Sequence, residues 1–117
     1  MLNMQLIVIK REQEERAHYL EQIAKQIMDN AWNLKSGEAI GFVLHDFSPW
    51  AVSLIVDYML MDERLWESIQ LTYDEDLEND LVITRLQTSE GILQILVRTA
   101  KQDEERRIYY IHIWKVK

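Results

Sequence analysis

The stretch "LHDFSPWA" at residues 44–51 holds the residue types best suited to chemistry. His45 and Asp46 are adjacent where an apolar run ends, and the single proline of the chain, Pro49, follows shortly after. A histidine beside a carboxylate near a helix start can act as a general base or bind a metal ion, and the helix start adds N–H donors for an anion. One hypothesis is therefore a small metal-dependent or acid–base hydrolase that uses His45 and Asp46.

His112 is the candidate third residue of such a site. It lies in the last apolar run of the chain, so it could meet His45 only if that run forms a strand beside residues 38–45. The remaining histidine, His18, is expected on the solvent side of a helix. A buried or half-buried histidine with a purely structural role is the competing interpretation of His112.

The same stretch also has the pattern of a junction between a strand and a helix. Ser48 is a good N-cap, Pro49 suits the first helical position, and Phe47 can pack on Val52 as a hydrophobic staple. In this interpretation Asp46 and Ser48 satisfy free amides at the helix start, and His45 ends the strand. We prefer it, and so expect no catalytic residue, no cofactor and no metal site.

An acidic run at residues 72–80, "TYDEDLEND", suggests a calcium or magnesium loop. An EF-hand loop that began at Asp74 would need glycine at position 79 and glutamate at position 85. The chain has Asn79 and Arg85 there, so the pattern fails. We expect a solvated connector, with an electrostatic docking patch as the alternative. No phosphate-binding glycine loop or nucleophile elbow is present, and the absence of cysteine excludes thiol catalysis and Cys-based metal sites.

Composition limits the classes of function. The chain has 117 residues, 48% of them hydrophobic, which suits a single α+β domain spanning residues 1–117. A net charge of −7 disfavours nucleic acid and anionic membranes as partners. No apolar run reaches the roughly 20 residues of a membrane span, and the cysteine-free sequence fits a reducing compartment. We expect a cytoplasmic protein.

Hydrophobic periodicity predicts the elements. Apolar residues spaced by three and four, from Leu20 to Leu34, predict a helix over residues 11–35, and a nearly all-apolar helix is expected over 50–61. A break near residues 62–64 should precede a short segment that carries Leu65, Trp66 and Ile69. β-rich runs predict the strands, at residues 5–10, 38–45, 80–87, 91–99 and 107–116.

These elements follow the order β-α-β-α-β-β-β. The first two strands should pair in parallel, and the last three should form an antiparallel meander because their connections are short. The sequence therefore predicts an α+β fold, with a mixed sheet and the helices packed on one face.

Large aromatic residues are numerous, with 4 Trp and 5 Tyr. Rings of this type are enriched in interfaces, which predicts self-association through the helix over residues 50–61 or through the last strand, whose segment "YYIHIW" would be an adhesive exposed edge. We therefore expect a homodimer, and a small acidic protein-interaction module (regulator, adaptor or inhibitor) with an unidentified protein partner. Two alternatives are the hydrolase that uses His45, Asp46 and His112, and a sensor that holds a small ligand between helix and sheet.

Overall fold

A computed structural model describes residues 4–76, 81–100 and 108–117. The elements in chain order are β1 (Met4–Lys10), α1 (Ala17–Trp32), β2 (Ala39–His45), α2 (Pro49–Leu60), the 3-10 helix η1 (Glu63–Leu65), β3 (Ile69–Asp76), β4 (Leu81–Thr88), β5 (Gly91–Ala100) and β6 (Ile108–Lys115). The predicted α+β class and order of elements are confirmed, with one strand, β3, in addition to those expected.

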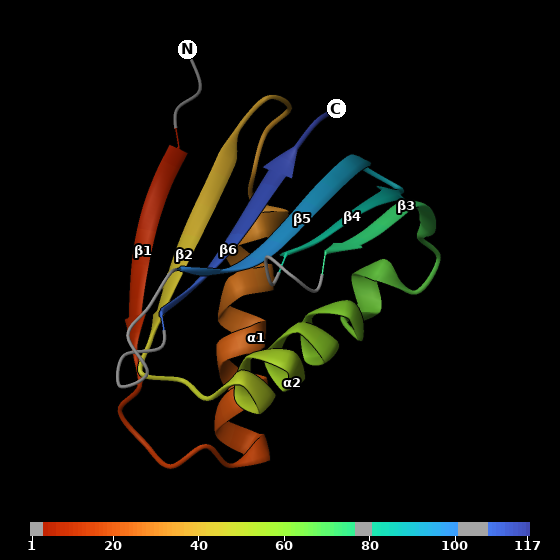
Figure 1. The fold of residues 1–117 in the computed structure, drawn as a ribbon. Helices are drawn as coiled ribbons and strands as arrows, with labels where there is room; N and C mark the ends of the chain where they lie inside the picture. The colour runs from red at the N-terminus through yellow and green to blue at the C-terminus, as the bar shows by residue number, and fades with distance from the viewer. Residues whose placement is uncertain (1–3, 77–80, 101–107) are drawn as a thin grey trace.

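The strands form one six-stranded sheet in the order β1-β2-β6-β5-β4-β3 (Figure 1). β1 and β2 pair in parallel, as expected for strands joined by a crossover helix, and every other pair is antiparallel. The antiparallel part therefore begins with β3 and has four strands in sequence. β1 and β3 are the two edges, so the expectation that "YYIHIW" forms an exposed edge is wrong: β6 lies between β2 and β5.

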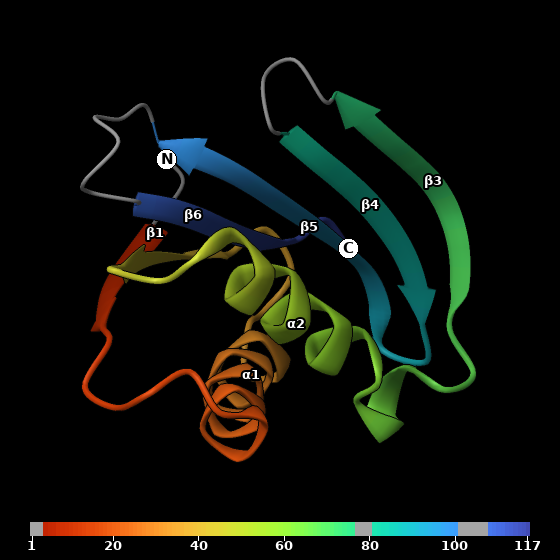
Figure 2. The same ribbon diagram turned by 60° about the horizontal axis from the view of Figure 1, so that its bottom comes forward.

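Both helices pack on one face of the sheet, and α1 and α2 also pack on each other (Figure 2). The apolar stripe of α1 is buried as its periodicity predicts, with Leu20, Ile27 and Met28 at most 1% exposed. Alternate residues of the strands complete the core, among them Phe42 on β2 and Ile111 on β6, neither of them exposed at all. The core thus lies between the two helices and one side of the sheet.

Two segments differ from the sequence-based expectation. Helix α1 begins at Ala17, because the charged residues 11–16 form the connection that leads into it. Residues Thr72 to Asp76, expected in a connector, extend strand β3, in which every residue is exposed. Ile69, Leu71 and Tyr73 alternate with polar residues, as is typical of a strand, but the acidic residues that follow indicated a connector. Residues 77–80, the rest of the expected connector, lie outside the described part of the chain.

The break after α2 was predicted correctly near residues 62–64. Asp62 caps the single turn of η1 by accepting a hydrogen bond from Arg64 N at 2.9 Å. Leu65 is buried, as a member of a second short segment should be, but Ile69 already belongs to β3. No helix among the described residues has the length and apolar character needed to cross a membrane.

Candidate functional site

Strand pairing places the two candidate histidines on the same face of the sheet but apart. β6 does lie beside β2, the condition for His112 to approach His45. In the register of that pair, however, His45 is opposite Ile108, and His112 is opposite Gly41. Four residues of strand separate the two positions, a distance of about 13 Å. The structure does not bring the two imidazoles into one site.

The Asp46 carboxylate turns to a different partner. Arg11 Nη2 donates to Asp46 Oδ2 at 3.0 Å, and Arg11 Nε donates to the Asp46 carbonyl oxygen at 2.9 Å. Asp46 itself has a φ of 70°, a left-handed conformation that aspartate tolerates better than most residues. We expected the Asp46 side chain to accept hydrogen bonds from the free amides at the start of α2. It does not do so, because its carboxylate pairs with Arg11 instead. It joins the β2–α2 turn to the residues after β1.

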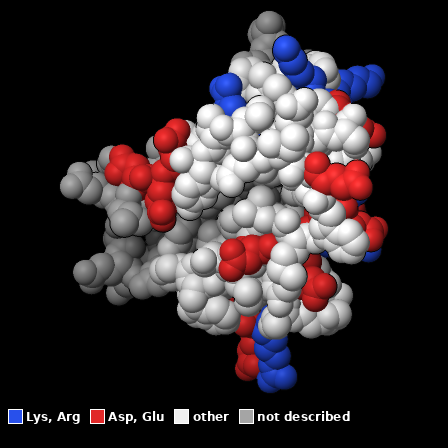
Figure 3. Space-filling model, turned by 90° about the vertical axis from the view of Figure 1, so that its right-hand side faces the viewer, with Lys and Arg blue, Asp and Glu red and all other residues white. Residues whose placement is uncertain are grey.

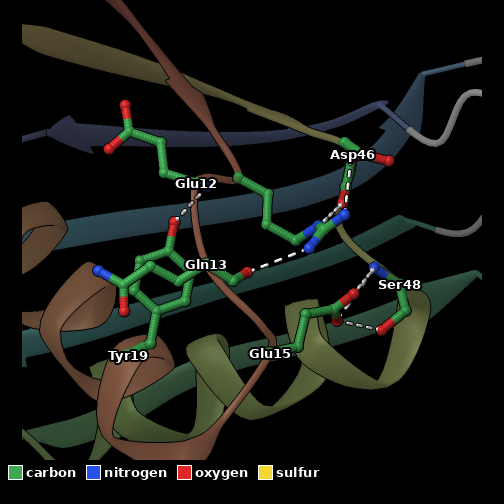
Figure 4. A network of polar contacts seen from close by, with 7 residues as sticks. Glu12, Gln13, Glu15, Tyr19, Asp46 and Ser48 are labelled. Atoms are coloured by element: carbon green, nitrogen blue, oxygen red, sulfur yellow. Dashed lines mark hydrogen bonds and ion pairs between the residues drawn. The ribbon is translucent and has the colours of Figure 1, made fainter.

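Ser48 fulfils its predicted role as N-cap, since its Oγ accepts a hydrogen bond from Ala51 N at 3.3 Å. The Glu15 carboxylate, which comes from the β1–α1 connection, accepts from both the amide and the hydroxyl of Ser48 (Figure 4). Tyr19 anchors the same connection, because its hydroxyl accepts from Glu12 N at 3.0 Å. The polar groups around His45 and Asp46 thus hold two chain connections together.

No metal site is visible in the described ranges. Within residues 4–76, 81–100 and 108–117, no group of three or more His, Asp or Glu side chains is placed to hold a metal ion. The hydrolase hypothesis needs the side chains of His45, Asp46 and His112 in one place. In the structure they have different neighbours. Among the described residues, His45, Asp46 and His112 do not converge on one site.

The face of the sheet opposite the helices, the open face, carries apolar residues. We define it by the outward-facing residues of β1, β2, β6 and β5. On the edge strand β1, Met4, Leu6 and Val8 are 48%, 55% and 62% exposed. Inward along the same face come residues that are half-buried or buried by their neighbours: Gly41, Val43, Tyr110, His112, Trp114, Gln94 and Leu96.

This open face contains no acidic residue on these four strands, although the chain has 20 of them. Its charged side chains are Lys10, at the end of β1, and Arg98, whose guanidinium lies 5.1 Å from the centre of the Tyr110 ring. In an acidic protein, the absence of carboxylates from these four strands of the face is a local reversal of composition, since the first carboxylate on this side of the sheet is Asp74 of the far edge strand β3. Large contiguous apolar patches on a protein surface are typical of interaction sites.

His112 lies within the open face and contributes to its apolar character. Its ring meets that of Tyr110 edge-on, with the ring centres 6.1 Å apart. Burial lowers the pKa of the His112 imidazole below its ordinary value, and the positive charge of Arg98 adds to the effect. The neutral imidazole is favoured, so His112 serves as part of an uncharged surface.

Trp114 supplies a second unusual feature of the open face. Its indole Nε1 is shielded from solvent, yet it has no hydrogen-bond partner among the described residues. A buried indole N–H usually finds an acceptor. The Trp114 indole therefore contributes apolar surface to the open face and no polar contact.

Sequence reasoning identified the aromatic residues of β6 but missed the contribution of β1. "QLIVIK" is apolar at both alternating sets of positions, a pattern that was read only as a strand. In the structure Ile7 and Ile9 pack toward the core, while Leu6 and Val8 lie on the open face. An edge strand with apolar residues on both sides was the signal for a second apolar surface.

In comparisons with known proteins, no family model, no curated protein and no solved structure matches the chain.

Proposed function

We propose that this chain is a small acidic interaction module of the cytoplasm, a regulator, adaptor or inhibitor, that works as a homodimer. The observation that carries the proposal is the open face, an apolar sheet surface without carboxylates on a chain of net charge −7. Sheets pack face to face at about 10 Å, with side chains of the two inner faces interdigitated. A second copy would cover Leu6, Val8 and their neighbours in this way.

A second copy suits this surface because a twofold interface must be complementary to itself. An apolar face meets that requirement without any pattern of charges, whereas a face that carried several carboxylates would repel its own copy. The two cations lie where repulsion is limited, with Lys10 at a strand end and Arg98 over the ring of Tyr110. The acidic surfaces remain outside the interface, where each dimer would present them twice to a protein partner.

Light scattering coupled to size exclusion tests the proposal, with two variants matched in chemistry. Leu6→Glu places a carboxylate on the open face, and Met61→Glu places one at the end of α2, on the helix side; the wild-type residues are 55% and 65% exposed. We expect twice the chain mass for the wild type and for Met61→Glu, and the single-chain mass for Leu6→Glu. A wild type that stays monomeric at the highest concentration, or a Leu6→Glu variant that still dimerises, contradicts the proposal.

A further inference from the structure

A groove of about 780 Å³ lies between helix α2 and the strands β3, β4 and β5, on the helix side of the sheet. Helix α1 covers the other side of α2, so one flank of α2 faces this groove. Val52, Val56 and Leu60 form that flank, and Val82, Leu86 and Val97 are part of the opposite wall. The volume is within the range of sites that hold small organic molecules.

The groove explains a property of α2 that the packing of a small domain would not require. This helix is apolar on nearly its whole circumference, with Ser53 and Asp57 as a narrow polar edge. Its contacts with the sheet and with α1 account for Ala51, Ile55 and Met59, which are fully buried. Val56 is only half-buried and Leu60 is 40% exposed, since they line the groove. The third apolar flank is therefore left for a ligand.

Negative charge lies on both walls of the groove. Asp57 comes from α2, and Glu75 and Asp76 come from β3. Among the described residues that line the groove there is no Lys, Arg or His. Figure 3 shows a hollow on this side of the molecule, bordered mainly by uncharged surface, with carboxylates on its margins. Asp57 and Glu75 form no ion pair with any residue that the structure describes.

Aromatic and polar groups complete the lining. Tyr73 on β3 is 54% exposed, and Tyr109 on β6 is half-buried at the far wall. Tyrosine rings attract cations over their faces and apolar groups over their area. Thr84, the one buried polar residue of the described core, donates from Oγ1 to the Thr72 carbonyl oxygen at 3.1 Å. The Thr84 hydroxyl therefore already has a hydrogen-bond partner within the protein. A ligand would be recognised by the apolar walls and the carboxylates of the groove.

We propose that this groove binds a lipophilic organic cation, a molecule with an apolar body and an ammonium or similar positively charged group. The apolar body would lie between Val56 and the β4–β5 wall, and the charge would lie near Asp57 and Glu75. An anion of the same shape would meet uncompensated carboxylates, so the sign of the charge is the main determinant of specificity. This site is separate from the open face and does not depend on dimer formation.

Tetraphenylphosphonium and tetraphenylborate are suitable probes because they share size and shape and carry opposite charges. Calorimetric titration of the wild type with each ion, at low and moderate salt, measures the effect of charge alone. We expect one phosphonium ion bound per chain, at least tenfold more tightly than the borate. Moderate salt should weaken phosphonium binding, since exposed charges are screened.

Three variants locate the site. Ser53→Trp places a bulky ring into the groove from an exposed position and should abolish binding of the phosphonium ion. Asp57→Asn removes one charge without changing shape and should weaken binding about two- to fivefold, the range expected for an exposed charge pair. Glu21→Gln, an equal loss of charge on the solvent side of α1, is the control that should leave binding unchanged.

The proposal is overturned if the borate binds as tightly as the phosphonium ion, or if neither binds at millimolar concentration. It is also overturned if Ser53→Trp, shown to be folded by its circular dichroism spectrum, binds the phosphonium ion as the wild type does. Equal weakening by Asp57→Asn and Glu21→Gln would reduce the effect to net charge and would likewise contradict a site in the groove. Failure of dimer formation affects none of these readouts.

Discussion

Gly41 lies directly opposite His112 in the β2–β6 pair, and a Cβ added to Gly41 would lie 3.1 Å from Leu6 Cδ1 and 3.8 Å from His112 Nε2. The absence of a side chain at Gly41 thus lets Leu6 of the edge strand fold over β2 toward the imidazole. Residues of three strands meet at this point and form a continuous apolar surface. That continuity is what makes the open face suitable for a second sheet.

The position of His112 predicts how stability depends on pH. Its pKa is lowered in the folded state, so the unfolded chain binds a proton more readily than the folded chain does. The free energy of unfolding should therefore be constant above the ordinary histidine pKa of about 6.5 and fall as pH decreases below it. Urea denaturation between pH 7.5 and 5.5 measures this fall, above the range in which most carboxylates titrate.

His112→Gln should flatten that dependence, whereas His18→Gln, a change at an exposed helix position, should leave it intact. Dimer formation would bury His112 further, so the dimer should also dissociate more readily as pH decreases. An unchanged pH dependence in His112→Gln would mean that His112 is not the group responsible.

Two glycines with positive φ offer a matched test of the hairpin geometry. Gly91 has a φ of +133°, and an added Cβ would lie 1.9 Å from the Lys117 carbonyl oxygen, which accepts a hydrogen bond from Ile92 N. Gly37 has a φ of +85° and open space around it. We expect Gly37→Ala to cost about 1 kcal/mol of stability and Gly91→Ala at least about 2 kcal/mol, measured by urea denaturation. Equal losses would contradict the close approach of the C-terminal carbonyl.

Arg64 connects the end of α2 to α1 and is predicted to matter for stability. Its guanidinium donates to Asp62 at 2.7 Å and to Asp29 at 3.0 Å, and lies 5.3 Å from the centre of the Trp32 ring. Arg64→Met should cost about 1–3 kcal/mol, since charged hydrogen bonds are lost. Arg64→Lys should recover only part of this, because an ammonium cannot bond both carboxylates and stack in the same way.

The same change should be visible in the titration of Asp62. Hydrogen bonds from Arg64 lower the pKa of the Asp62 carboxyl in the folded state. The ionised carboxylate therefore stabilises the fold above the unfolded pKa of about 3.9, and this stabilisation is lost as pH falls from there through the lowered folded pKa. In Arg64→Met that pKa should rise, as followed by NMR of the carboxyl carbon. A pKa that does not move would contradict the role assigned to the pair.

Asp46 provides a test of whether the His45–Asp46 stretch acts as a junction. Asp46→Gly relieves a left-handed conformation worth about 1 kcal/mol and loses an exposed ion pair worth about 0.2–1 kcal/mol, so stability should change little. Asp46→Ala loses the ion pair without relief of the backbone and should be clearly less stable. Thermal unfolding of both variants measures the difference, and equal stability would contradict it.

Much of the fold could be predicted from the sequence because local patterns determine it. The spacing of Leu20, Ile27 and Met28 predicts one face of α1, and Ser48 with Pro49 predicts the start of α2 to the residue. Strand β3 was not predicted, because the acidic residues of its second half indicated a connector and outweighed the alternation of Ile69, Leu71 and Tyr73. The position of β6 between β2 and β5 is set by pairing between distant segments, which sequence periodicity does not encode.

The candidate sites were less accessible to sequence reasoning. The adjacency of His45 and Asp46 suggested chemistry, but the left-handed backbone of Asp46 and its contact with Arg11, 35 residues away, are properties of the fold. The sequence predicts that α2 is apolar on several sides. Only the structure shows that one of those sides is α1 and another is a groove.

Isotope-filtered NMR on a mixture of labelled and unlabelled chains detects contacts between two copies only, and so tests dimer formation through the open face. We expect intermolecular contacts from the methyl groups of Leu6, Val8 and Leu96 on the open face. Absence of any intermolecular contact at millimolar concentration, or contacts from Leu60 and Met61 on the helix side instead, would contradict it.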